Sequence, residues 1–207
     1  PLFLGLMDEV GDRLRQCFLT DNPLTFVLSA PGSIGMETSF VNLVEPGEKV
    51  VICINGVFGG RMKEICERIG AKVVPLEFDW GTPVDPEVVS LALDEHQDAV
   101  VVGFVHAETS TGVRSDAAAI AAVANEHGCL TIADCVTSQG GVELRVDEWG
   151  LDVAYSGSQK CLSCVPGLSP VSVSDRATEV IKNRSTPVQS WFLDLNLVMG
   201  YWGGGSK

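Results

Sequence analysis

The sequence predicts an α/β fold in which a mostly parallel sheet is sandwiched between two layers of helices. Strand-like and helix-like runs alternate along the chain, which is the pattern of βαβ units joined by right-handed crossovers. The run 99–105 contains only apolar residues and glycine, which is typical of a parallel strand buried on both faces. A length of 207 residues, 45% of them hydrophobic, suits one such domain with a sizeable core.

Each expected element rests on the spacing of apolar residues and on the turn residues that bound it. Residues 2–18 have apolar side chains at helical spacing, and Asp21-Asn22-Pro23 forms a turn after them. The other expected helices cover residues 34–44, 61–70, 87–95, 116–127, 175–184 and 189–202. The expected strands cover residues 24–28, 49–54, 72–77, 99–105, 130–133, 153–155 and 169–173.

Composition narrows the classes of partner. The formal net charge of −13 leaves no basic footprint for nucleic acid or an anionic membrane. We find no apolar run of about 18 residues and no signal peptide, so we expect a soluble, cytoplasmic protein without a membrane span. Seven cysteines, an odd number scattered through apolar runs, favour reduced thiols. Cys161 and Cys164 form a CxxC, but a second pair or nearby histidines are missing, so no metal site is expected.

Polar or small residues follow directly after five of the expected strands. Ligands of open α/β sheets bind beyond the carboxyl ends of the strands, so these clusters are expected to surround one ligand. The clusters are Ser29–Ser33, Asn55–Phe58, His106–Thr111, Asp134 and Ser156–Lys160.

The first and last clusters have the clearest chemistry. A strand, a small-residue loop and a helix N-terminus form an anion site at 29–33, although the sequence is neither a P-loop nor GxGxxG. Lys160 ends a Gly/Ser turn after a short apolar run, where desolvation would lower its pKa and make its amine nucleophilic. An ordinary surface lysine remains the alternative for Lys160 taken alone.

Pyridoxal phosphate needs the whole set of groups. Its aldehyde needs a lysine, its pyridinium nitrogen needs a carboxylate such as Asp134, and its ring face needs a flat neighbour such as Phe58. Its phosphate needs backbone N–H groups at a helix N-terminus. The clusters therefore indicate a pyridoxal-phosphate site.

At these residues the sequence resembles the class V, fold type I pyridoxal-phosphate aminotransferases, and most of all the alanine–glyoxylate and serine–pyruvate aminotransferase group. The resemblance extends to about Trp202, and SGSQK is its strongest part. The segments that carry it are SAPGSIGMET (29–38), NLVEPGEKVVICINGVFGGR (42–61), HAETSTGV (106–113), ADCVTSQGGVELRVDEWGLDVAYSGSQKCL (133–162) and PGLSPVSVS (166–174).

The resemblance implies a catalytic role for two of these residues. Lys160 would form the Schiff base with the cofactor and, once freed by substrate, would act as the general base and acid of the proton transfer. Asp134 would pair with the pyridine nitrogen, and Val136 would pack under the ring.

The resemblance also implies a set of residues that bind the cofactor. Phe58 would stack on the ring, and Thr109 would place a hydroxyl near the ring and the substrate. Gly32 and Ser33 would form the phosphate cup, with Gln159 beside the phosphate. Pro31 departs from the Gly-rich form of this loop and removes one N–H donor from the cup.

The family also implies a function and a domain organisation. The expected reaction is ping-pong transamination of alanine or serine with glyoxylate or pyruvate, in a homodimer. Residues 1–186 would be the large cofactor domain without its N-terminal segment, and 187–202 a helix leading toward a C-terminal small domain that carries the substrate-carboxylate arginine. Residues 203–207 would be a flexible tail or a cloning scar.

Two alternatives stay open. One is a pyridoxal-phosphate-dependent lyase or cysteine desulfurase, although Cys161 and Cys164 adjoin the lysine and are badly placed for the mobile cysteine that such enzymes use. The other is an inactive, truncated cofactor domain.

Overall fold

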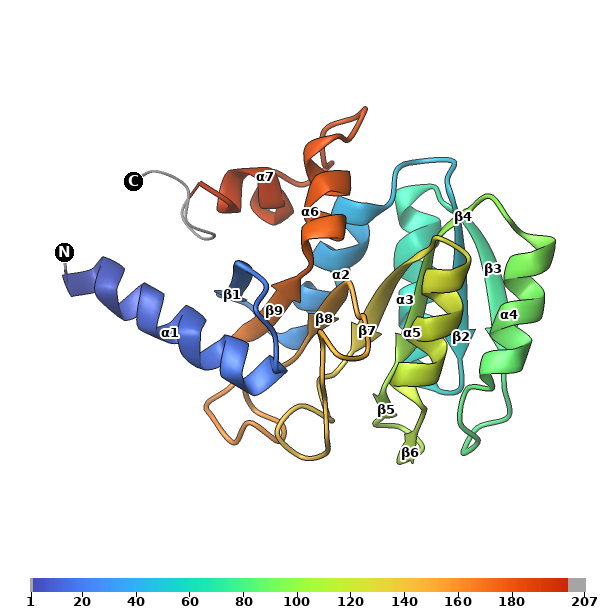
Figure 1. The fold of residues 1–207 in the computed structure, drawn as a ribbon, viewed down its shortest axis with the longest axis horizontal. Helices are drawn as coiled ribbons and strands as arrows, with labels where there is room; N and C mark the ends of the chain where they lie inside the picture. Colours follow the sequence, from blue (N-terminus) through green and yellow to red (C-terminus); the bar gives the residue numbers. More distant parts are fainter. Residues whose placement is uncertain (1, 201–207) are drawn as a thin grey trace.

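The computed structural model describes residues 2–200 and has the expected three-layer α/β/α architecture (Figure 1). The seven strands of the sheet lie in the order β1-β9-β8-β7-β4-β2-β3. They are β1 (Leu24–Leu28), β2 (Lys49–Ile54), β3 (Lys72–Glu77), β4 (Ala99–Val105), β7 (Leu130–Asp134), β8 (Val153–Tyr155) and β9 (Ser169–Val173).

Most strands of the sheet are parallel, and the antiparallel pairs lie at the edge formed by β9 and β1. Strands β3, β2, β4, β7 and β8 are parallel neighbours, whereas β9 pairs antiparallel with both β8 and β1. A separate antiparallel ribbon, β5 (Ala107–Glu108) and β6 (Val113–Arg114), follows β4 in a segment that the sequence presents only as a polar loop. It lies at the carboxyl end of the sheet.

Helices cover both faces of the sheet, and the sheet separates the core into two clusters, one on each face. One cluster packs under α2 (Gly32–Leu43), α3 (Val57–Ile69) and α6 (Asp175–Lys182). The other packs under α4 (Pro86–Glu95), α5 (Ala117–Glu126) and the last turn of α1 (Leu2–Phe18). Figure 1 shows α4 and α5 side by side at the end of the sheet that lies away from α1.

Side chains along a strand point alternately to the two faces of the sheet, and this alternation decides on which face the site lies. Ile132 of β7 and Val153 of β8 belong to the cluster under α2 and α3, so Asp134 and Tyr155, two residues further on, point to that same face. Asp134 and Tyr155 are also register partners. A carboxylate and a phenol are thereby brought together from positions 21 residues apart.

The expected helix over 189–202 is wrong within the described residues, and 201–202 lie outside them. The segment instead forms a 3-10 turn at Trp191–Leu193 and a short helix, α7 (Leu195–Val198). Asn42, buried in α2, breaks the segment between these two elements. Its Nδ2 donates to the Leu193 carbonyl at 2.7 Å, and its Oδ1 accepts from the Leu195 N–H at 2.9 Å.

The remaining helices differ from expectation mainly at their ends. Helix α3 begins at Val57, four residues before its expected start, and α2 begins at Gly32, directly after Pro31. Helix α1 has its expected bounds, but Leu2 and Leu6 of its apolar stripe are exposed and only its C-terminal end packs on the core. Across residues 2–200, no helix is both long enough and apolar enough to cross a membrane.

Two neighbouring glycines of α3 test how closely this helix packs on β2. A Cβ atom at Gly59 would lie 2.6 Å from the Cys53 carbonyl oxygen, whereas a Cβ at Gly60 would meet nothing within 4 Å. Gly59→Ala should lower the free energy of unfolding by about 1–3 kcal/mol, because the clash is with backbone. Gly60→Ala should leave it unchanged or raise it by up to about 1 kcal/mol through helix propensity. Urea unfolding of both variants would measure this, and equal effects would contradict the packing.

Candidate functional site

The Asp134 carboxylate is the centre of the site. It is 3% exposed at the end of β7, and it accepts the Val136 N–H on Oδ1 and the Tyr155 hydroxyl on Oδ2, both at 2.9 Å. Burial raises the pKa of Asp134 to about 6, and the nearby Glu108 carboxylate adds to the rise. The two hydrogen bonds and the Arg61 guanidinium oppose it. The group is thus poised to hold or release a proton near neutral pH.

Tyr155 is a site residue that the sequence did not single out. It is fully buried, and burial together with the neighbouring Asp134 holds the pKa of its phenol well above the usual value. The phenol therefore stays protonated and donates to the carboxylate. Strand β8 looks like ordinary core in the sequence, and only its pairing register with β7 identifies this tyrosine.

Three of the predicted residues, Gly32, Val136 and Gln159, lie close to one another beside this carboxylate. Asp134 holds the turn that leads to Val136, and the Val136 side chain reaches both Gly32 at the start of α2 and Gly157 after β8. A Cβ atom at Gly32 would lie 3.0 Å from the Val136 Cγ2 atom, and a Cβ at Gly157 would lie 3.1 Å from the Gln159 Oε1 atom. The phosphate-cup helix, the residue expected under the ring and the lysine turn are therefore neighbours.

Lys160 lies at the end of this turn, but it is not buried. The Lys160 N–H bonds the Gly157 carbonyl at 3.4 Å, and the side chain is exposed. The desolvation expected from the preceding apolar run is absent because β8 ends at Tyr155 and the turn carries the chain out of the core. Among residues 2–200, no carboxylate pairs with the Lys160 amine.

Thr109 lies next to the same turn. Its hydroxyl donates to the Thr137 hydroxyl at 3.2 Å, and Thr137 in turn donates to the Ala107 carbonyl at 2.6 Å. Thr109 is exposed, and Thr137 directly follows Val136. The β5–β6 ribbon thus presents the Thr109 hydroxyl beside the chain that leaves β7.

Glu108 positions Phe58 through the backbone. Its carboxylate is 1% exposed and accepts the N–H groups of Phe58 and Gly59 on Oε2, at 3.1 and 3.4 Å. It also accepts the N–H and the hydroxyl of Ser110 on Oε1. A buried carboxylate at the first turn of α3 fits the positive end of the helix dipole. The partly buried Phe58 ring is thereby fixed at the start of α3.

Arg61 is a second residue that sequence reasoning missed. Its Nη1 donates to the Ser33 hydroxyl at 2.9 Å, and its guanidinium carbon lies 4.8 Å from the centroid of the Phe58 ring. Arg61 stands three residues after Phe58 on α3, so both side chains share a helix face. That spacing was the signal available in the sequence.

The two cysteines that follow the lysine, Cys161 and Cys164, are exposed, and their thiols are free. The Cys161 thiol donates to the Thr137 carbonyl and the Cys164 thiol to the Leu162 carbonyl, each at 3.3 Å. Both lie in the turn directly after Lys160, which is the placement that argued against a desulfurase cysteine.

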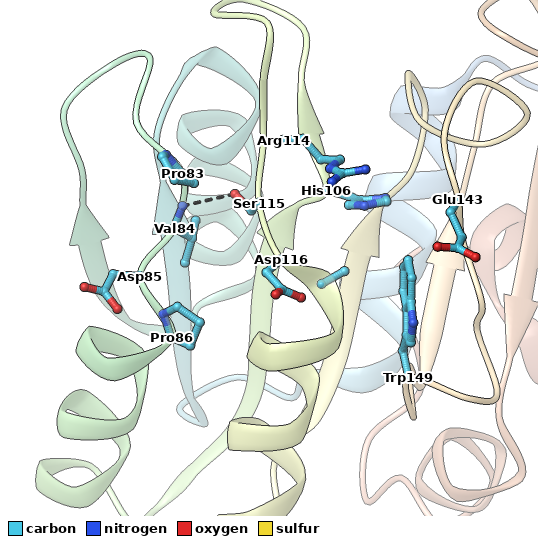
Figure 2. Close-up of a pocket in the computed structure, with 11 residues that line it drawn as sticks. Pro83, Val84, Asp85, Pro86, His106, Arg114, Ser115, Asp116, Glu143 and Trp149 are labelled. Carbon is cyan, nitrogen blue, oxygen red and sulfur yellow. Dashed lines mark hydrogen bonds between the residues drawn. The ribbon is translucent and has the colours of Figure 1, made fainter.

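A cavity of about 630 Å³ lies on the opposite face of the sheet, near α4 and α5 (Figure 2). The His106 ring meets Trp149 edge to face there, with 5.7 Å between the ring centroids. Burial and the nearby Arg114 lower the pKa of His106 to about 4, so this ring is neutral at pH 7. None of the predicted cofactor residues lines this cavity, which is therefore separate from the Asp134 site.

The residues at the Asp134 site fit pyridoxal phosphate. Asp134 offers a buried carboxylate for the ring nitrogen, while Val136 and Phe58 offer apolar surface for the ring. Gly32 is the first residue of α2, and the N–H groups of a first helical turn have no partner within the helix, so they can bind a phosphate. The fold and these residues are those expected of an α/β domain that binds such a cofactor at the carboxyl edge of its sheet.

Comparison with known proteins identifies the family. Residues 12–187 match the family model described as aminotransferase class V, so the chain belongs to the class V aminotransferases. Members of this class are generally dependent on pyridoxal phosphate.

The relatives and solved structures agree with this assignment. The chain is 36% identical over 198 residues to alanine–glyoxylate aminotransferase of Callithrix jacchus, covering 96% of this chain and 48% of the relative. It is 34% identical to (S)-ureidoglycine–glyoxylate transaminase of Bacillus subtilis, covering 98% and 53%. The crystal structure of an alanine–glyoxylate aminotransferase from Nostoc sp. superposes with a TM-score of 0.95 at 44% identity, covering 99% and 54%. The chain thus spans about half the length of the relatives it matches.

Tyr155→Phe is expected to raise the pKa of Asp134 above about 6, because the lost phenol donates to the ionised carboxylate and favours it. A hydrogen bond to a charged group contributes about 1.5–3 kcal/mol, so its loss should raise the pKa of Asp134 by about 1–2. A ¹³C NMR titration of labelled aspartate γ-carboxyls would measure the change, with Asp134→Asn assigning the resonance. An unchanged titration would show that the phenol does not stabilise the carboxylate.

The pKa of Asp134 also sets a pH dependence of stability. An unfolded aspartate has a pKa of about 3.9, so the folded chain binds this proton more tightly than the unfolded chain does. The stability from protonated Asp134 is complete below about pH 4 and is lost as the pH rises through about 6. The free energy of unfolding of the wild type minus that of Asp134→Asn should therefore fall by up to about 3 kcal/mol over this range. Urea unfolding at several pH values measures it, and a constant difference would contradict the raised pKa.

Proposed function

We propose that this chain is the cofactor-binding part of a pyridoxal-phosphate-dependent aminotransferase. The substrates would be a small amino acid, alanine or serine, and a 2-oxo acid, glyoxylate or pyruvate. The observation that carries the proposal is the buried Asp134 carboxylate, joined through Val136 to the helix N-terminus at Gly32 and to the turn that ends at Lys160. The names of the relatives, which act with glyoxylate, support the choice of acceptor.

Each residue has a defined task in this proposal. Pyridoxal phosphate, when bound, supplies an aldehyde that exchanges amines and a ring that accepts electrons from the substrate. Lys160 provides the amine that holds the aldehyde and afterwards moves the proton at the substrate carbon. Its side chain is exposed, and no carboxylate among residues 2–200 forms a salt bridge with it, so the amine is accessible.

The other residues hold and tune the ring. Asp134 keeps a carboxylate at the ring nitrogen, and Tyr155 orients that carboxylate. Val136 and Phe58 would contact the ring, and Thr109, whose hydroxyl bonds Thr137, would offer a hydroxyl near the ring and the substrate. Gly32, Ser33 and Gln159 bind the phosphate. A homodimer, with both substrates binding at this edge of the sheet, is part of the same proposal.

Trapping the cofactor tests the assignment of Lys160. Borohydride treatment after incubation with pyridoxal phosphate should attach the cofactor to the wild-type chain, with the added mass on the Lys160 peptide. Before borohydride treatment, the wild-type chain with cofactor should show a visible absorption band. Lys160→Ala should show neither this band nor, after treatment, the added mass. Lys182→Ala is the matched control, because Lys182 is a surface lysine that pairs with Glu179. Attachment that survives in Lys160→Ala would refute the assignment.

The reaction itself is tested separately with alanine and glyoxylate, on this chain and on a longer one that extends beyond Lys207. Pyruvate and glycine should appear in equal amounts if the proposal holds. Trapped cofactor without transamination in either chain would overturn the reaction while leaving the cofactor site in place.

A further inference from the structure

Arg61 is a cation in direct contact with the predicted phosphate cup. Its Nη1 donates to the hydroxyl of Ser33, the second residue of α2, at 2.9 Å. Its guanidinium also lies over the Phe58 ring, 4.8 Å from the centroid. Arg61 therefore connects the two parts of the site that are expected to hold the phosphate and the ring.

Arg61 has no salt-bridge partner within the described residues, although its charge also acts on the buried Asp134 carboxyl. Across 2–200, no salt bridge includes Arg61, whose contacts are a neutral hydroxyl and an aromatic ring. Arg68 provides a contrast, since it lines the same cavity of about 450 Å³ between α2 and α3 but pairs with Glu64 at 2.6 Å. A guanidinium has five N–H donors, and the contact with Ser33 uses one of them.

The cup has fewer backbone donors than a glycine-rich loop would offer. Pro31 precedes α2 and has no N–H, and the Ile34 N–H is already bonded to the Pro31 carbonyl at 2.8 Å. The amides of Gly32 and Ser33 are the first two of the helix. A doubly charged phosphate at this position would gain from a charge-assisted donor, which an arginine supplies in a geometry that fits two phosphate oxygens.

We propose that Arg61 is a ligand of the cofactor's phosphate group and compensates for the donor lost at Pro31. The inference rests on the proposed function, since it concerns the same cofactor site. Because the guanidinium also packs on Phe58, the residue that binds the phosphate supports the ring that stacks on the cofactor.

The decisive measurement compares pyridoxal phosphate with pyridoxal, which lacks the phosphate. Dissociation constants for both are measured by absorbance and fluorescence titration of the wild type, Arg61→Gln, Arg61→Lys and Arg68→Gln. Arg61→Gln should weaken pyridoxal phosphate binding about 10- to 100-fold and leave pyridoxal binding nearly unchanged. Arg61→Lys should recover part of the loss, and Arg68→Gln should bind both ligands like the wild type. The ³¹P chemical shift of the bound cofactor should change in Arg61→Gln and not in Arg68→Gln.

The outcomes separate this inference from the proposed function. If wild type and Arg61→Gln bind pyridoxal phosphate equally, Arg61 is not a phosphate ligand, although the cofactor site stands. Equal losses for both ligands in Arg61→Gln would also overturn the inference, because the residue would then act only through Phe58 or through the fold. Circular dichroism of Arg61→Gln separates these two cases. If the wild type binds neither ligand, the proposed function fails and the inference fails with it.

Discussion

Burial of the Asp134 carboxylate is the constraint on which the arrangement of this site depends. A buried ionisable group costs several kcal/mol unless hydrogen-bond donors surround it. The donors here are the Tyr155 phenol on β8 and the Val136 N–H in the turn after β7. The first contact requires the register of β7 against β8, and the second requires the tight turn that brings Val136 onto Gly32 and Gly157. Satisfying one carboxylate therefore fixes three segments of the site together.

The fold was predictable wherever a short-range pattern is sufficient. Continuous apolar runs such as 99–105 identify buried strands, and their alternation with helices identifies the layers. Strand direction at the β9 edge was not predictable, because five residues look the same in either orientation. The helix expected over 189–202 does not form because a buried amide 151 and 153 residues away, on Asn42, binds the backbone of Leu193 and Leu195. The end of β8 at Tyr155 was predicted, but the exposure of Lys160 depends on the path of the turn that follows, which apolar patterning does not resolve.

The same division applies to the candidate site. The residues identified in the sequence lie in turns after strands, where polar side chains stand out, and the structure places Gly32 and Val136 beside the turn that contains Gln159. Tyr155 and Arg61 were missed because their importance comes from a partner on another element: a carboxylate one strand away and a hydroxyl on α2. Such pairings depend on register and helix orientation, and these are properties of the assembled sheet.

Helix α2 joins the predicted phosphate cup to residues 193–195. Its first residue is Gly32 in the predicted cup, and Asn42 near its other end binds the backbone on both sides of Asp194. The 12 residues of α2 span about 18 Å, and a packed helix is stiff along its axis. A displacement of residues 193–195 would therefore be transmitted along α2 to Gly32 and Ser33. If a phosphate binds at Gly32 and Ser33 as proposed, α2 would make its affinity sensitive to the position of residues 193–195.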